Sequence, residues 1–96
     1  MPASARRGDP GVVHCSGYVI AAGSPDVFIN TRAAARVGDP STTHLVPGAP
    51  CFPHVSKIAA GSPNVFVNNL PLARQGDPMT ACTKIAQGSP NVFANG

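Results

Sequence analysis

The sequence predicts an all-β chain in which three short repeats close into a ring. Two phrases alternate along its 96 residues, and each occurs three times: Arg-x-Gly-Asp-Pro and Gly-Ser-Pro-x-Val-Phe-x-Asn. No stretch shows the helical apolar period over a length that would indicate an amphipathic helix. Ten glycines and eleven prolines instead interrupt the chain at short intervals. We therefore expect short strands that are joined by tight turns.

The first phrase is expected to form a turn. It occupies residues 6–10, 36–40 and 74–78. Gly-Asp-Pro breaks a regular element, and an aspartate can hold such a bend in an Asx-turn with its own side chain. An enzyme rarely needs three equivalent acids, so we interpret the three aspartates as structural and not as catalytic.

The second phrase contains the predicted strands, and it spans residues 23–30, 61–68 and 88–95. Its β-branched and aromatic residues favour strands at residues 27–29, 65–67 and 92–94. The asparagine that follows each strand is turn-prone, and Gly-Ser-Pro lacks the Lys-Ser/Thr pair of a phosphate-binding loop. The aliphatic side chains share one strand face and the phenylalanines share the other, and the pattern leaves open which face is internal.

The two ends of the chain are expected to lie side by side. The chain ends at Asn95 and Gly96, where the other two repeats continue toward an Ala-Arg pair. Residues 2–6 resemble that continuation, as a comparison with residues 70–74 shows. The third repeat is therefore divided between the two ends, which predicts a closed ring and not an open solenoid. We expect residues 1–96 to form a single domain.

Charge and composition exclude several classes of function. Seven basic and four acidic residues give a net charge of +3, and the chain has no tryptophan and one tyrosine. Scattered bases and few aromatic rings do not indicate a nucleic-acid interface. No apolar run approaches the roughly 20 residues of a membrane helix. The first nine residues lack the apolar segment of a signal peptide, so we expect folding in a cytoplasm, where the cysteines are thiols or metal ligands.

Potential metal ligands share one position in the repeats. His14, His44 and Cys82 each lie five residues after the aspartate of the first phrase, so in a ring of three units they would converge near one axis. His54 lies in an insertion of the middle repeat that is long enough to supply a fourth ligand. Three imidazoles and one thiolate suit one tetrahedral Zn²⁺, and four protein ligands make such a site structural. Mg²⁺ and Ca²⁺ prefer oxygen ligands, whereas ligand type does not exclude redox metals.

Two cysteines and an open coordination position give alternatives to this ligand set. Cys51 lies three residues before His54 and can replace it as the fourth ligand. Cys15 adjoins His14, and neighbouring side chains on a strand face opposite ways, so we interpret Cys15 as a small buried side chain or an exposed thiol. Without His54, the other three ligands would leave room for a water molecule, as in a zinc hydrolase.

The residues resemble those of the PAAR-repeat proteins, which are named for a Pro-Ala-Ala-Arg motif. The motif is represented by Pro71-Leu72-Ala73-Arg74, by residues 32–36 and more loosely by residues 2–6, and no copy is literal. The two flanking phrases are more specific, and the resemblance covers essentially the whole chain. It implies a small β-rich cone with a sharp tip and a triangular base. It also implies a zinc ion near the tip, held by His14, His44, His54 and Cys82.

The same resemblance implies a role without catalysis. The chain would form the tip of a type VI secretion spike, with one copy seated on a trimeric VgrG-like protein. It would be assembled in the cytoplasm and leave the cell with the spike, making transient contact with the target membrane, and effector proteins are possible further partners. Related cones cap contractile phage tails, which is the alternative machine. A free-standing adaptor that binds by strand addition is a third possibility.

Overall fold

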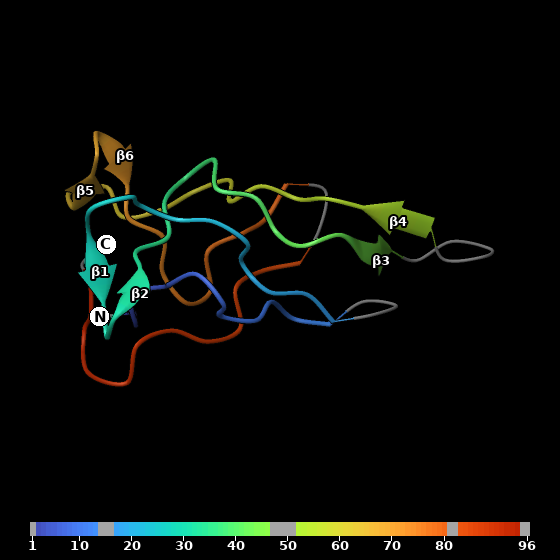
Figure 1. Ribbon diagram of the computed structural model, residues 1–96, viewed down its shortest axis with the longest axis horizontal. Helices are drawn as coiled ribbons and strands as arrows, with labels where there is room; N and C mark the ends of the chain where they lie inside the picture. The colour runs from blue at the N-terminus through green and yellow to red at the C-terminus, as the bar shows by residue number, and fades with distance from the viewer. Residues whose placement is uncertain (1, 14–16, 47–51, 81–82, 95–96) are drawn as a thin grey trace.

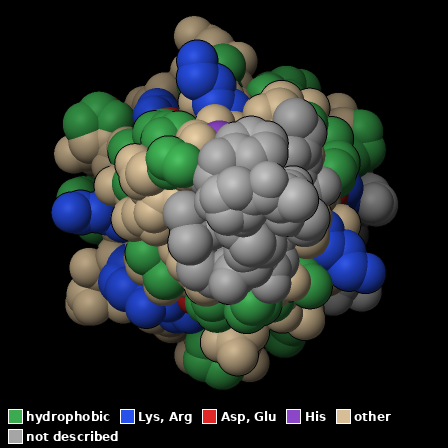
Figure 2. Space-filling model, turned by 90° about the vertical axis from the view of Figure 1, so that its right-hand side faces the viewer, with side chains coloured by type: hydrophobic (Ala, Val, Ile, Leu, Met, Phe, Trp, Pro, Cys, Tyr) green, Lys and Arg blue, Asp and Glu red, His purple; other side chains and the backbone are tan. Residues whose placement is uncertain are grey.

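The computed structural model describes residues 2–13, 17–46, 52–80 and 83–94. All regular structure within these ranges is strand or isolated bridge, so the predicted all-β class is confirmed for them. The molecule is elongated, with extents of 40 × 23 × 23 Å. Viewed from one end of the long axis, lysine and arginine side chains are spread around the circumference (Figure 2). Within the described ranges, no helix has the length and apolar character needed to cross a membrane.

Three antiparallel hairpins supply the named strands. The pairs are β1 (Phe28–Ile29) with β2 (Arg32–Ala33), β3 (His44–Val46) with β4 (Phe52–His54), and β5 (Phe66–Val67) with β6 (Leu70–Pro71). β1 and β5 fall within two of the predicted strands. The hairpin of β3 and β4 lies in the insertion of the middle repeat, where no strand was predicted. It occupies the end of the molecule opposite to the other two hairpins (Figure 1).

The turns of two hairpins explain their asparagines. Asn30 and Thr31 join β1 to β2 with φ values of 53° and 66°, and Asn68 and Asn69 join β5 to β6 with φ values of 53° and 65°. A two-residue turn with positive φ at both positions matches the right-handed twist of the strands. Asparagine tolerates this left-handed backbone, which is why the residue follows each of these strands.

The first phrase forms a turn that its own ion pair closes. In the first repeat, Asp9 N–H donates to the Arg6 carbonyl at 3.0 Å, and Gly8 between them has a φ of 90°. Positive φ at the third position of such a turn favours glycine. Asp9 Oδ2 accepts from the Arg6 backbone N–H at 2.7 Å, and its Oδ1 pairs with Arg6 Nη2 at 2.9 Å. The same contacts join Arg36 to Asp39, and Arg74 to Asp77.

This geometry supports the structural interpretation of the aspartates and corrects its detail. An Asx-turn would use a backbone N–H two residues after the aspartate. Instead, each carboxylate accepts the N–H three residues before it and binds the guanidinium of that same arginine. A bidentate pair between two charged groups is stronger than a single Asx hydrogen bond to the carboxylate, and all three carboxylates are buried.

Backbone hydrogen bonds among three alanines form a closed cycle. Ala5 N–H donates to the Ala73 carbonyl, Ala73 N–H donates to Ala35, and Ala35 N–H donates back to Ala5, at 2.9, 2.9 and 3.1 Å. Each alanine directly precedes the arginine of an ion pair, and each is fully buried. This alanine cycle joins segments from the beginning, the middle and the later part of the chain around one centre.

The two ends of the described chain pair as expected. Ala3 forms a bridge with Phe93, as Ala33 does with Phe28 within the hairpin of β1 and β2. Ser4 N–H donates to the Val92 carbonyl at 2.9 Å. The predicted strand at residues 92–94 is therefore reduced to one bridge, with a partner supplied by the other end of the chain.

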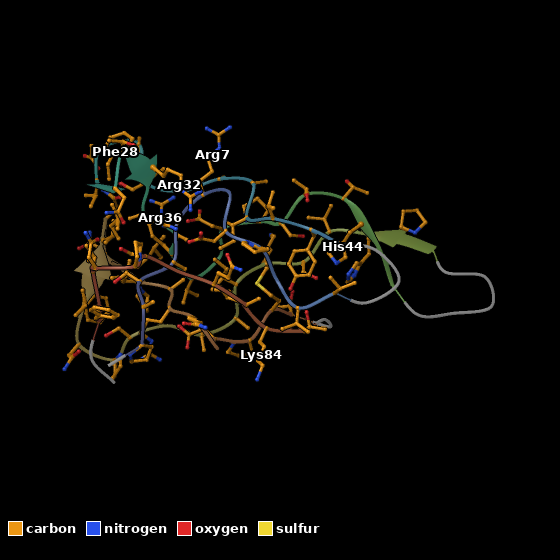
Figure 3. The ribbon with its side chains drawn as sticks, turned by 90° about the horizontal axis from the view of Figure 1, so that it is seen from below. Arg7, Phe28, Arg32, Arg36, His44 and Lys84 are labelled. Atoms are coloured by element: carbon orange, nitrogen blue, oxygen red, sulfur yellow. The ribbon has the colours of Figure 1, made fainter. Side chains whose placement is uncertain are left out.

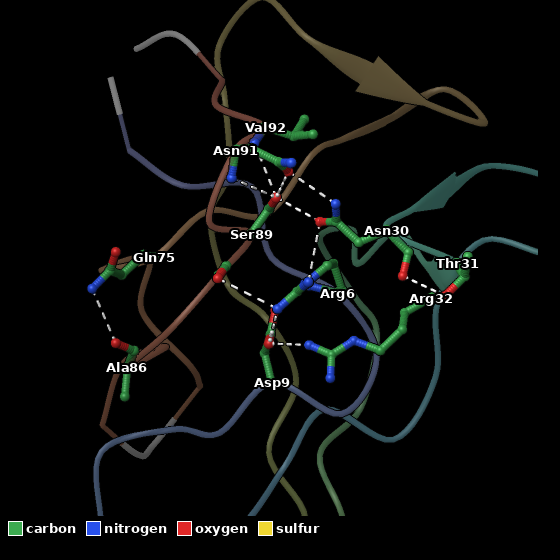
Figure 4. Close-up of polar contacts among 11 residues, drawn as sticks. Arg6, Asp9, Asn30, Thr31, Arg32, Gln75, Ala86, Ser89, Asn91 and Val92 are labelled. Carbon is green, nitrogen blue, oxygen red and sulfur yellow. Dashed lines mark hydrogen bonds and ion pairs between the residues drawn. The ribbon is translucent and has the colours of Figure 1, made fainter.

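Serine and asparagine side chains of the second phrase link one repeat to another. Ser89 Oγ accepts from the Val92 N–H at 2.9 Å, which confirms Gly-Ser-Pro as a turn, and donates to Asn30 Oδ1 at 2.6 Å (Figure 4). Arg6 Nη1 also donates to Asn30 Oδ1, at 3.1 Å. The equivalent contacts of Asn68 are with Ser24, Arg36 and Asp26. Hydrogen bonds from Asn68 and then Ser24 lower the pKa of the Asp26 carboxyl.

The phenylalanines of the second phrase face outward. Phe28, Phe66 and Phe93 are 59%, 57% and 49% exposed. The residues that follow them are buried: Ile29, Val67 and Ala94. The sequence pattern left open which strand face is internal, and the structure places the phenylalanine face outside. Val27 and Val92, which share the aliphatic face in the prediction, are exposed.

Two clusters of apolar side chains form the core. One surrounds the alanine cycle and contains Ala5, Tyr18, Ile20, Ala35, Ile58, Ala73, Met79 and Ile85. The other contains Ile29, Ala34, Val67, Leu72 and Ala94. Ile20, Ile58 and Ile85 occupy equivalent positions, three residues before the glycine of the second phrase. The repeats therefore contribute similar side chains to a shared interior.

The glycine of Gly-Ser-Pro gives a direct test of this packing. A Cβ at Gly61 would lie 2.7 Å from the Leu72 carbonyl oxygen, so Gly61→Ala should lower the free energy of unfolding by about 1–3 kcal/mol. Gly17→Ala is the control, because its Cβ would meet nothing within 4 Å. Urea denaturation should separate the two variants, and equal stability would contradict the close packing.

Candidate metal centre

Two of the four predicted ligands face each other across one hairpin. His44 begins β3, His54 ends β4, and the two residues are direct partners in the strand register. Residues opposite each other in an antiparallel pair project to the same face, which brings the two imidazoles together. Their Nε2 atoms are 2.8 Å apart, and the ring planes are inclined by 73°. Figure 3 shows His44 beside the end of the molecule that β3 and β4 form.

The surroundings of His44 fix its tautomer. Its Nδ1 lies 2.9 Å from the Thr42 carbonyl oxygen and 3.4 Å from Ser41 Oγ. A carbonyl oxygen only accepts, so Nδ1 carries the hydrogen, and Nε2 of the neutral ring presents its lone pair toward His54. A backbone carbonyl that holds the other ring nitrogen is the usual support of a metal-binding histidine. His44 is also buried, which restricts its ring to this orientation.

Tyr18 is a supporting residue that sequence reasoning missed. Its ring stacks on His44 with centroids 4.2 Å apart and planes inclined by 20°. Its hydroxyl contacts Thr83 Oγ1 at 2.9 Å, and Thr83 Oγ1 in turn donates to the Val12 carbonyl. A Cβ at Gly11 would lie 1.9 Å from the Tyr18 ring, so this glycine makes room for the aromatic side chain. The available signal was the single tyrosine of the chain, two residues before a repeated isoleucine.

Two serines hold the base of the same hairpin. Ser41 Oγ accepts the Ser56 backbone N–H at 3.0 Å, and both serines are buried. Ser56 Oγ lies 3.3 Å from His54 Nε2. His54 is half-buried, so its ring is less enclosed than that of His44. The hydroxyl groups of these two serines therefore lie beside the two imidazoles and connect the base of β3 and β4 to each other.

The described half of the site fits a metal ion. Two imidazole ligands of a tetrahedral zinc ion have nitrogens about 3.3 Å apart, given Zn–N bonds of about 2.0–2.1 Å. The observed 2.8 Å is shorter by half an ångström and suits a hydrogen bond from His54 Nε2–H to the His44 lone pair. A small outward rotation of either ring would bring the two Nε2 atoms to the separation of two zinc ligands.

The remaining candidates lie outside the described residues. These are His14 and Cys82 of the predicted set, together with Cys15 and Cys51. Within the part of the chain that the structure describes, no three His, Cys, Asp or Glu residues come together as a metal site. The complete ligand set of His14, His44, His54 and Cys82 stays a prediction.

Comparison with known proteins addresses the predicted resemblance. A family model described as PAAR motif matches residues 48–96, which is just over half of the chain. The match covers the last two copies of Gly-Ser-Pro-x-Val-Phe-x-Asn and the last copy of Arg-x-Gly-Asp-Pro. The comparison with curated proteins gives no match. The resemblance seen in the sequence is confirmed, and the chain belongs to the PAAR-motif family.

Proposed function

We propose that this protein is the tip of an injection spike. In this proposal it is a cone of three pseudo-symmetric units, formed by residues 1–96 as a single domain, that caps a trimeric VgrG-like protein of a type VI secretion system. The observation that carries the proposal is the alanine cycle, in which equivalent positions of three repeats meet around one centre. A single chain with this arrangement can match the three-fold axis of a trimer.

The docking end is proposed to be the end that carries β1 to β2 and β5 to β6. It presents Phe28, Phe66 and Phe93, which are exposed at equivalent positions. Exposed apolar side chains that recur around one end of a small monomer mark an interaction site. Three similar contacts suit three identical subunits, so one copy of the chain is expected per trimer. The β3–β4 end would then point away from the partner.

The metal is proposed to stiffen the opposite end. One structural Zn²⁺ per chain would be held by His14, His44, His54 and Cys82. Support comes from the lone pair that His44 Nε2 presents to His54, and from the carbonyl and ring contacts that orient His44. When bound, zinc ties together chain segments that are distant in sequence. The carbonyl and ring contacts orient the His44 imidazole as a ligand, and we propose no catalytic role for the chain.

Localisation and further partners follow from the same proposal. The chain is expected to assemble in the cytoplasm, to leave the cell with the spike, and to contact the target membrane transiently. Effector proteins are expected to travel with it. The tip of a contractile phage tail would need the same shape, and the identity of the trimeric partner distinguishes the two machines.

Zinc content tests the metal proposal. Protein purified without added metal should contain close to one equivalent of zinc by elemental analysis, and His44→Ala and Cys82→Ala should lose most of it. Cys15→Ala is the matched control and should keep it, while Cys51→Ala and His54→Ala together identify the fourth ligand. Structural zinc can contribute roughly 10–16 kcal/mol, so chelation should lower the melting temperature strongly. Less than about a tenth of an equivalent of zinc in the folded protein would contradict the proposal.

Native mass spectrometry of the complex tests capping. One chain is expected per partner trimer, and Phe66→Asp should abolish binding because it places a charge within the apolar contact. Val19→Asp is the matched control, since Val19 is also exposed and lies outside the three copies of the second phrase. Both variants should keep their zinc. A stoichiometry of three chains per trimer would mean side-on binding and would rule out the cap.

A further inference from the structure

A pocket beside the hairpin of β1 and β2 combines positive charge with an aromatic wall. It has a volume of about 330 Å³ and is lined by Arg7, Gly8, Phe28, Thr31, Arg32 and Ala33. Figure 3 places Phe28 near one end of the molecule, with Arg32 and Arg7 farther along the flank. The two arginines therefore lie on the flank beside Phe28, at the border of the end that is proposed to dock on the trimer.

More arginines than acidic residues surround this pocket. Asp9 Oδ1 pairs with Arg6 Nη2 at 2.9 Å and also with Arg32 Nη2 at 2.5 Å (Figure 4), so one buried carboxylate serves two guanidinium groups. In the other two repeats, one described arginine pairs with each aspartate. Arg7 is exposed and joins no ion pair among the described residues. With one aspartate among three arginines, the surroundings of the pocket have a local net charge of +2.

The fold does not require these two arginines. Arg7 N–H donates to the Ala33 carbonyl at 2.8 Å, and the equivalent backbone bonds of Val37 and Gln75 measure 3.0 and 2.8 Å. In the sequence repeat, Leu70 occupies the position of Arg32. The same backbone is thus built with apolar or neutral side chains elsewhere, and the cationic pocket is particular to one of three flanks.

The donors of Arg32 are not all used by the chain itself. Its Nη2 pairs with Asp9, whereas its Nε is buried without a hydrogen-bond partner. A guanidinium offers five N–H donors in a planar fork that suits a carboxylate, and Phe28 beside it offers an apolar face. Two excess charges are few for a nucleic-acid surface, which contacts many phosphates. The combination favours a carboxylate whose neighbour is apolar.

We propose that this pocket binds an acidic segment of a second protein, with a carboxylate on Arg7 and Arg32 and an adjacent apolar side chain on Phe28. The pocket borders the proposed docking end and shares Phe28 with it, so its binding is measured on the free chain, separately from capping. The chain would contact its trimer through three similar phenylalanines, whereas the pocket for the second protein occurs once. The second partner would therefore bind once per spike.

Peptide binding to the free chain of residues 1–96, as purified, tests this site without the trimer. The probe is a short fluorescein-labelled peptide in which glutamate alternates with leucine, and its control carries glutamine in place of glutamate. Fluorescence anisotropy should show binding of the glutamate peptide that weakens as salt is added, since screening reduces the attraction between exposed charges. The glutamine peptide should bind at least roughly tenfold more weakly.

Matched variants locate the binding. Arg7→Gln and Arg32→Leu copy the residues that the other repeats carry, so both should fold, and each should weaken the glutamate peptide roughly tenfold. Lys84→Gln removes the same charge from an exposed position elsewhere and should leave binding unchanged. Melting temperatures check that the variants are intact.

Several results would overturn the proposal. These are no binding of the glutamate peptide, equal binding of the glutamine peptide, or unchanged affinity in both arginine variants. Tighter binding to phosphatidylserine vesicles than to the peptide would assign the surface to a membrane instead. None of these outcomes would affect the stoichiometry of capping, because the trimer is absent from the assay.

Discussion

The alanine cycle is the interaction on which the rest of the structure depends. Its three backbone hydrogen bonds close between Ala5, Ala35 and Ala73 and fix three chain segments around one centre. An arginine follows each alanine directly and reaches the aspartate of its own turn. These turns also position the buried isoleucines Ile20, Ile58 and Ile85, whose backbone N–H groups donate to the backbone carbonyls of the three aspartates. Closure also recruits the beginning of the chain as a strand partner for its end.

Repetition explains how much the sequence could predict. Three copies of each phrase identified the turns, two of the paired strands and the adjacent ends, because equivalent sequences must make equivalent contacts in a closed arrangement. Features that occur once were not predicted. The β3–β4 hairpin lies in an insertion without a repeat, and Tyr18 occupies a position where the other repeats have Ser56 and Thr83. The outward direction of Phe28 depends on which strand face meets the core, and alternation alone does not determine that.

Where the chemistry of the chain differs between repeats, it is concentrated in two places. At the β3–β4 end, a backbone carbonyl and a tyrosine ring orient His44 toward His54. Both histidines of this pair belong to the middle repeat. On one flank near the other end, Arg7 and Arg32 surround a pocket whose backbone is shared by neutral residues elsewhere. A repeated backbone with local side-chain differences lets one small chain face a symmetric partner and still present individual sites.

Amide hydrogen exchange tests the closed cycle most directly. The N–H groups of Ala5, Ala35 and Ala73 should exchange at closely similar rates and be among the slowest in the chain, because opening any one of them requires the ring to open. Residues this near to a chain end ordinarily fray and exchange fast. Slow exchange at Ala5 equal to that at Ala35 and Ala73 is the predicted result. Fast exchange at Ala5 alone would show that the chain is open at its beginning and would contradict the account.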